Sequence, residues 1–205
     1  NDWWQENKRF AVVTASGAAH TWAGNSRENR LTPFENDPVT DRTAEAIFVR
    51  DDASGDAWSP TPGPMPRTSN TGPIVIQHSA GVTRFTRVTR GIRHALEVFV
   101  DASDPVKYSM LTLTNETTAI RALSVFAYND WVLGPPREGQ SQHVKTTLDS
   151  RSGAVFATTA YSDDAANRTA FAGTSDRVVS ATADRRSFLG RNGSLSAPAA
   201  IARTG

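Results

Sequence analysis

Aromatic and planar polar side chains crowd into residues 20–41, a stretch that begins at His20 and ends at Asp41. The indole face of Trp22 can stack on the C–H face of a pyranose ring. Amide, guanidinium and carboxylate groups around it can hydrogen-bond to vicinal hydroxyls, and these candidates are Asn25, Arg27, Arg30, Asn36 and Asp37. In the competing interpretation, Asn, Asp and Gly only form turns, and Arg27 pairs with Glu28 at the surface.

A second cluster, residues 129–138, follows directly on a run of alternating apolar residues. A rigid strand ending there could direct Trp131 and Arg137 into a cleft, so both are candidate ligand-binding residues. Alternatively, Trp131 covers the core and Gly134-Pro135-Pro136 makes a sharp exit from the strand. The sequence alone leaves both interpretations open.

Conventional catalytic and metal-binding patterns are not found in this sequence. The four histidines, His20, His78, His94 and His143, are spread along the chain without HxH or HExxH spacing. His78 and His94 fall within strand patterns, where a single histidine usually packs at the edge of the core. Neither a phosphate-binding glycine loop nor a nucleophile elbow is present. We therefore expect no catalytic residue, no metal site and no cofactor.

The elements that must position these clusters are strands, because the dominant apolar period along the chain is two. The expected strands are residues 10–14, 46–49, 74–78, 82–90, 92–100, 107–114, 120–128, 144–148, 154–161, 169–173, 178–181 and 187–189. The runs from 82 to 128 are separated by short turns and predict a meander. Residues 22–38 and 59–71 are expected to be long loops, the second carrying four of the prolines. No helical stripe persists for three turns, so the chain is predicted to be all-β, a large sandwich of antiparallel sheets.

The amino-acid composition of the chain argues against some classes of binding partner. Lys and Arg number 22 and Asp and Glu 21, so a net charge of +1 disfavours nucleic acid or an anionic membrane as the main partner. No apolar run is long enough to span a bilayer, so no direct membrane insertion is expected. The chain has no cysteine, which fits a reducing, cytoplasmic compartment. Because the chain starts without Met and stops at Gly205 with no evident final element, we expect one domain, residues 1–205, cut from a longer protein.

Several uncommon motifs resemble those of glycoside hydrolase family 94, formerly glycosyltransferase family 36, and in particular its cyclic β-1,2-glucan synthase branch. The first is T-W-A-G-N-S-R-E-N-R-L-T-P-F-E-N-D-P-V, from Thr21 to Val39. In the same order follow W-S-P-T-P (Trp58–Pro62), D-P-V-K (Asp104–Lys107), the W-V-L-G run within 129–138, and F-L-G-R-N-G-S-L (Phe188–Leu195). The resemblance extends over nearly the whole chain.

This resemblance implies a β-supersandwich with a galactose-mutarotase-like topology, followed in family members by a linker and an (α/α)₆ barrel. The barrel holds the catalytic Asp and most of the phosphate site, and phosphate attacks the anomeric carbon with inversion. The sandwich contributes to a dimer interface and to one wall of the sugar site. The chain is therefore expected to be a non-catalytic accessory domain whose partners are a β-glucan oligosaccharide, the barrel of the same parent and a second copy. For the glucan synthase branch, the resemblance also implies a parent anchored in the bacterial inner membrane.

Two alternatives remain from other functional classes. An aldose mutarotase would share the topology and use histidines with a carboxylate, but His78 and His94 lack that context. A purely structural dimerisation module would hold the barrel without touching sugar. Sugar binding separates this second alternative from the leading hypothesis, and optical rotation tests the first.

Overall fold

The computed structural model describes residues 9–34, 39, 43–68, 71–135, 140–160 and 169–203. The strands within this part are β1 (Arg9–Val13), β2 (Ala19–Ala23), β3 (Glu45–Asp51), β4 (Ala57–Trp58), β5 (Val75–Ser79), β6 (Val82–Thr89), β7 (Ile92–Val100), β8 (Lys107–Asn115), β9 (Leu123–Asn129), β10 (Val144–Leu148), β11 (Val155–Thr159) and β12 (Thr169–Ala172). The helical elements are the 3₁₀ helix η1 (Gln140–His143), α2 (Arg185–Leu189) and α3 (Ala199–Ala202). All strand pairs are antiparallel, in the sheets β1–β2, β4–β3–β9, β5–β6–β7–β8 and β10–β11–β12.

The four-stranded sheet β5–β8 follows directly from the alternation in the sequence. On β6, Phe85 and Arg87 are buried while Arg84 is exposed, and on β7 His94 and Leu96 are buried. The register places Phe85 opposite Leu96 and Arg87 opposite His94. One face of this sheet therefore forms a wall of the core, and the other faces solvent.

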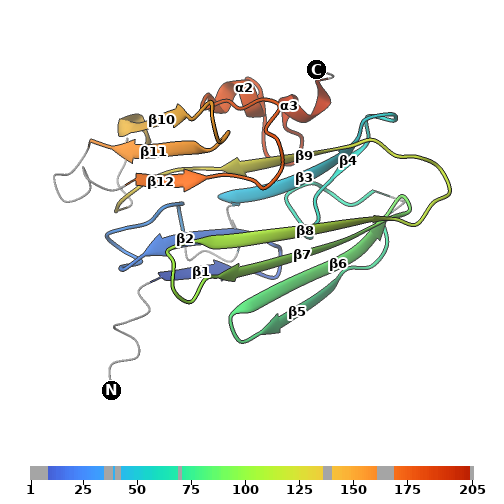
Figure 1. Cartoon of the computed structure of the whole chain (residues 1–205), viewed down its shortest axis with the longest axis horizontal. Helices are drawn as coiled ribbons and strands as arrows, with labels where there is room; N and C mark the ends of the chain where they lie inside the picture. The colour runs from blue at the N-terminus through green and yellow to red at the C-terminus, as the bar shows by residue number, and fades with distance from the viewer. Residues whose placement is uncertain are drawn as a thin grey trace.

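Strand β3 is buried on both faces. Phe48 shares an apolar cluster with Tyr128 and Ile201, whereas Val49 shares a different cluster with Trp58 and Ile92. Because successive side chains on a strand point to opposite faces, the β4–β3–β9 sheet is the middle layer. In Figure 1 it lies between the β5–β8 sheet and the layer formed by α2, α3 and β10–β12.

Two short helices close the outer face of that middle sheet. Asp184 caps the start of α2 by accepting a hydrogen bond from the Arg186 amide. The ring of Phe188 then lies 5.2 Å from that of Tyr128, between ring centroids, and adds to the cluster on the outer face of β3. A Cβ on Gly193 would overlap the Leu189 carbonyl, so this close approach after α2 requires glycine. The F-L-G-R-N-G-S-L motif thus serves packing.

The all-β antiparallel sandwich is confirmed, and so are the strands at the centre of the expected pattern. Residues 120–128 do not complete the meander, because β9 crosses to pair with β3 along its whole length. Residues 178–181 form no strand, and 187–189 belong to α2, started by its Asp184 cap. Strand β2 lies partly inside the stretch expected to be a loop, and the two-residue β4 was not anticipated. The 59–68 stretch is a loop as expected.

Candidate functional site

The structure brings the two candidate clusters side by side. Strand β2 carries Trp22, which forms an antiparallel bridge with Arg30, and Arg30 in turn bridges Gly134. The amide of Gly134 donates to the Arg30 carbonyl over 2.8 Å, and the Val132 amide donates to the Leu31 carbonyl over 2.9 Å. Segments about a hundred residues apart in the chain are therefore joined by backbone hydrogen bonds. We call residues 21–34 together with 131–134 the aromatic edge.

Asn25 shapes the turn within the aromatic edge. Its Oδ1 accepts hydrogen bonds from the amides of Arg27, over 2.8 Å, and Glu28, over 3.1 Å. The Asn29 side-chain amide donates to the Ala23 carbonyl over 2.7 Å. The oxygen of Asn25 is thus used to hold the loop, as the turn interpretation predicted.

Arg30 also works inside the loop. Its Nε donates to the Ser26 carbonyl over 2.7 Å and its Nη1 to the Phe34 carbonyl over 2.6 Å. The guanidinium carbon lies 5.8 Å from the centroid of the Phe34 ring. Arg30 therefore positions the loop, and its bridge to Gly134 fixes the second cluster against the first.

The remaining candidates differ in what they present to solvent. Arg27 is exposed and forms a 3.7 Å surface pair with Glu28, as the competing interpretation predicted. Trp22 and Trp131 are each half-buried, one held by β2 and the other by the chain after β9. Asn36, Asp37 and Arg137 lie outside the described residues, so their assignment stays a prediction.

A buried polar network that the sequence analysis missed lies under the aromatic edge. The Thr21 hydroxyl donates to Glu45 Oε1 over 2.6 Å, and the Thr32 hydroxyl donates to the same oxygen over 2.8 Å. Lys107 forms an ion pair with Glu45 and donates to the Thr21 hydroxyl over 2.8 Å. Burial lowers the pKa of Lys107 to about 7. The D-P-V-K motif pointed to this lysine, but its partner comes from β3, and no local pattern shows that pairing.

The histidines do not assemble an acid–base pair in the described part of the chain. His20 is buried, donates from Nδ1 to the Pro33 carbonyl over 2.6 Å, and meets the Phe34 ring edge-on. His94 is fully buried in the β5–β8 sheet, whereas His78 is exposed on β5 and bonds Thr83. The same described residues contain no group of three or more His, Cys, Asp or Glu able to hold a metal ion.

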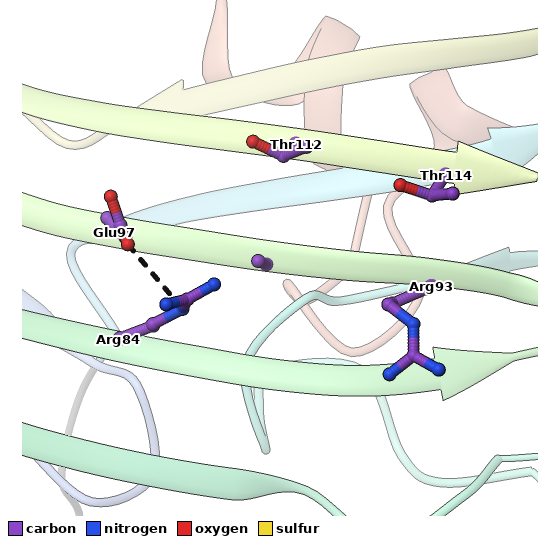
Figure 2. Close-up of a pocket in the computed structure, with 6 residues that line it drawn as sticks. Arg84, Arg93, Glu97, Thr112 and Thr114 are labelled. Carbon is purple, nitrogen blue, oxygen red and sulfur yellow. Dashed lines mark ion pairs between the residues drawn. The ribbon is translucent and has the colours of Figure 1, made fainter.

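A shallow depression of about 200 Å³ lies elsewhere, on the solvent face of the β5–β8 sheet (Figure 2). It is lined by Arg84, Arg93, Ala95, Glu97, Thr112 and Thr114. All three of its charged residues are already paired, Arg84 with Glu97 at 3.5 Å and Arg93 with Glu116 at 2.6 Å. None of the described candidate site residues lines it, and paired charges with threonines are typical of a solvated sheet face. No helix among the described residues is long and apolar enough to cross a membrane.

Comparison with known proteins identifies the family. The model of the glycosyl hydrolase 94 supersandwich domain matches residues 6–205. The chain is 37% identical over 196 residues to the cyclic beta-(1,2)-glucan synthase NdvB of Rhizobium meliloti (strain 1021), a match over 95% of this chain and 7% of that protein. It is 21% identical over 136 residues to the N,N'-diacetylchitobiose phosphorylase of Vibrio proteolyticus, over 66% of this chain and 17% of that enzyme.

A third relative is the solabiose phosphorylase of Paenibacillus borealis, 33% identical over 87 residues, which are 42% of this chain and 11% of that enzyme. The chain thus spans a small part of each of these proteins. The resemblance found in the motifs is confirmed across almost the entire length of the chain. This chain belongs to glycosyl hydrolase family 94, as its supersandwich domain.

Proposed function

We propose that this chain is a carbohydrate-binding accessory domain that performs no chemistry itself and helps to form the sugar site of a phosphorylase or cyclic β-1,2-glucan synthase. The family match and the names of the relatives support this class of parent. The ligand is a β-glucan oligosaccharide. The catalytic (α/α)₆ barrel of the same parent completes the site, and a second copy pairs with the domain in a homodimer. The domain lies on the cytoplasmic side of a parent anchored in the inner membrane.

The observation that carries this proposal is the Trp22–Arg30–Gly134 ladder. It holds two half-buried tryptophans, Trp22 and Trp131, in segments joined by backbone hydrogen bonds. An indole held by a strand loses little conformational entropy when a pyranose ring stacks on it. The buried Glu45–Lys107 pair fixes the underside of the loop, so the edge is organised before any ligand arrives.

A purely structural role has one observation in its favour. Phe156 and Phe171 lie opposite each other on β11 and β12, with ring centroids 6.5 Å apart, and both are exposed. An exposed aromatic pair on a sheet can cover a partner surface. If the domain only docks a partner, this pair is the best described candidate for the contact.

Calorimetric titration with sophorose and longer β-1,2-linked gluco-oligosaccharides tests the proposal. Since part of the site belongs to the barrel, we expect weak binding, with Kd of about 1 mM. Trp22→Ala and Trp131→Ala should each weaken binding about five- to tenfold, whereas Tyr108→Ala, which removes an exposed aromatic from β8, should leave it unchanged. Absence of heat up to about 20 mM oligosaccharide, with dimers in sedimentation that Phe156→Ala disrupts, would establish the scaffold role instead.

A further inference from the structure

The inward face of the β5–β8 sheet carries a buried arginine. Not all of its N–H groups have hydrogen-bond partners within the described structure. Arg87 on β6 is 4% exposed, and its Nε and Nη2 atoms have no hydrogen-bond partner within the described structure. His94, directly opposite on β7, is fully buried, and its Nδ1 likewise has none among these residues. We call these three nitrogens the donor cluster.

A guanidinium in this position needs an acceptor. Burial costs an ionised group several kcal/mol unless hydrogen bonds or an opposite charge compensate. Burial lowers the pKa of Arg87, and the charge of Arg67 lowers it further, but arginine keeps its proton in proteins. The group therefore stays charged, and its free N–H donors favour an anionic acceptor.

His94 adds a donor to the same place. Its Nε2 lies 3.3 Å from the Thr89 hydroxyl, which can donate to it. Burial, with a smaller contribution from the charge of Arg87, lowers the pKa of His94 to about 4, so the ring is neutral at pH 7. A neutral ring that accepts at Nε2 carries its proton on Nδ1. The donor cluster is thus complementary to a hydrogen-bond acceptor.

The loop after β4 brings a second arginine near the donor cluster. Arg67 is exposed on this loop and close enough to Arg87 to act on it electrostatically. The end of the loop is tied to β6 by the Thr71–Thr89 bridge and by the Gly72 amide, which donates to the Val88 carbonyl over 2.9 Å. Two arginines, one at the surface and one inside, make a positive potential that draws anions inward.

The W-S-P-T-P motif begins this loop and is almost entirely buried. Its Trp58 belongs to the same apolar cluster as Ile92, the inward residue two positions before His94 on β7. The indole Nε1 of Trp58 is a further buried donor without a partner in the described chain. The motif therefore packs against β7, the strand that carries His94.

We propose that Arg87 and His94 bind one small inorganic anion inside the sandwich, admitted past Arg67, and that this anion stabilises the folded domain. The site is separate from the aromatic edge and does not depend on sugar binding. Chloride and phosphate share the required chemistry, and the experiment distinguishes them.

Thermal unfolding of the chain in gluconate, chloride and phosphate, at constant ionic strength and pH 7, tests this inference. We expect chloride or phosphate to raise Tm by several degrees in a saturable way, because a ligand bound only to the native state adds stability with concentration. Arg87→Met should abolish the response, and Arg67→Gln should keep Tm in gluconate while shifting the midpoint severalfold to higher anion concentration.

A Tm that ignores the identity of the anion would overturn the proposal and leave water as the occupant. Retention of the response in Arg87→Met would overturn it as well. If that variant does not fold, the Arg67→Gln midpoint and a bromide-soaked crystal decide the matter. An anomalous peak between Arg87 and His94 supports the site, and a bromide-soaked crystal without one refutes it.

Discussion

Two buried arginines, Arg50 on β3 and Arg87 on β6, solve the same physical problem differently. Arg50 is 9% exposed, and each of its three guanidinium nitrogens has a partner. It pairs with Asp52 at 2.7 Å, donates to the carbonyls of Ile201 and Arg203, and lies over the Phe126 ring. Arg87 is more deeply buried, and two of its nitrogens have no partner in the described residues. A buried charge can thus serve as a structural clamp or as a binding group, and the acceptors around it decide which.

The middle sheet and the inward face of the β5–β8 sheet also differ more generally in how their buried charges are compensated. On β3, Asp51 is hydrogen-bonded by Arg121 and by the amides of Ala53 and Ser54. Burial alone would raise the pKa of Asp51, but these hydrogen bonds and the charge of Arg121 outweigh it and lower the pKa. On β6 and β7 no comparable carboxylate faces Arg87 within the described chain.

Replacing Arg50 should have the largest effect. Arg50→Met leaves the carbonyls of Ile201 and Arg203 without this donor, removes the ion pair with Asp52 and releases α3 from β3. Losing two charge-assisted hydrogen bonds to backbone carbonyls, each of about 1.5–3 kcal/mol, should cost about 3–5 kcal/mol, which urea unfolding would measure. Arg27→Met is the matched control, since its surface pair is exposed, and it should change stability by less than about 0.5 kcal/mol.

His94 should make stability depend on pH. Its pKa is about 4 in the folded chain and 6.5 when free, so the unfolded state binds more protons between these values. The contribution of His94 to stability is constant above pH 6.5 and falls as the pH drops towards 4, by about 3 kcal/mol in all. The lowered pKa of Asp51 acts only below its free value of 3.8, outside this window.

Urea unfolding at a series of pH values checks this, with His94→Leu as the comparison. The variant should lose most of the slope between pH 6.5 and 4, whatever its stability at pH 7. An unchanged slope in the variant would place the responsible group elsewhere.

The Glu45–Lys107 pair should show a coupling of intermediate size. In a double-mutant cycle with Glu45→Gln and Lys107→Met, we expect an interaction energy of about 1–3 kcal/mol, because the two groups share one buried network. Additive effects of the two substitutions would mean that the pair does not anchor the aromatic edge.

Arg87→Met should have the smallest effect. In a gluconate buffer we expect a change within about 1 kcal/mol of wild type, in either direction, because an apolar side chain replaces a poorly compensated charge. A loss as large as that of Arg50→Met under the same conditions would show that the two arginines do not differ, and that Arg87 is clamped by the protein itself.

The sequence predicts much of the fold and only part of the site. Alternation located β6, β7 and β8 to within one or two residues, because each has one buried and one solvated face. It could not show that β9 leaves the meander for β3, since that pairing joins residues about eighty positions apart. Alternation also predicted a strand at 187–189. The signal for a helix start there is Asp184, whose carboxylate accepts from the hydroxyl of Ser187 three residues later.

The site could be predicted only in part for the same reason, because its contacts join residues that are far apart in the sequence. Both aromatic clusters could be picked out from composition, but their contact through Arg30 and Gly134 is a tertiary fact. Asn25 and Arg30 stay candidate ligand-binding residues, and in the fold their described hydrogen bonds run to the loop itself, which composition alone does not show. Glu45 was missed because its partners Thr21 and Lys107 come from distant strands.

The most direct measurement is an NMR titration of the ¹⁵N-labelled chain with β-1,2-linked gluco-oligosaccharides. The proposed function predicts shifts of the Trp22 and Trp131 indole signals and of the amides of Leu31, Val132 and Gly134, all saturating together. Shifts confined to the solvent face of the β5–β8 sheet, or no shifts at all, would contradict it.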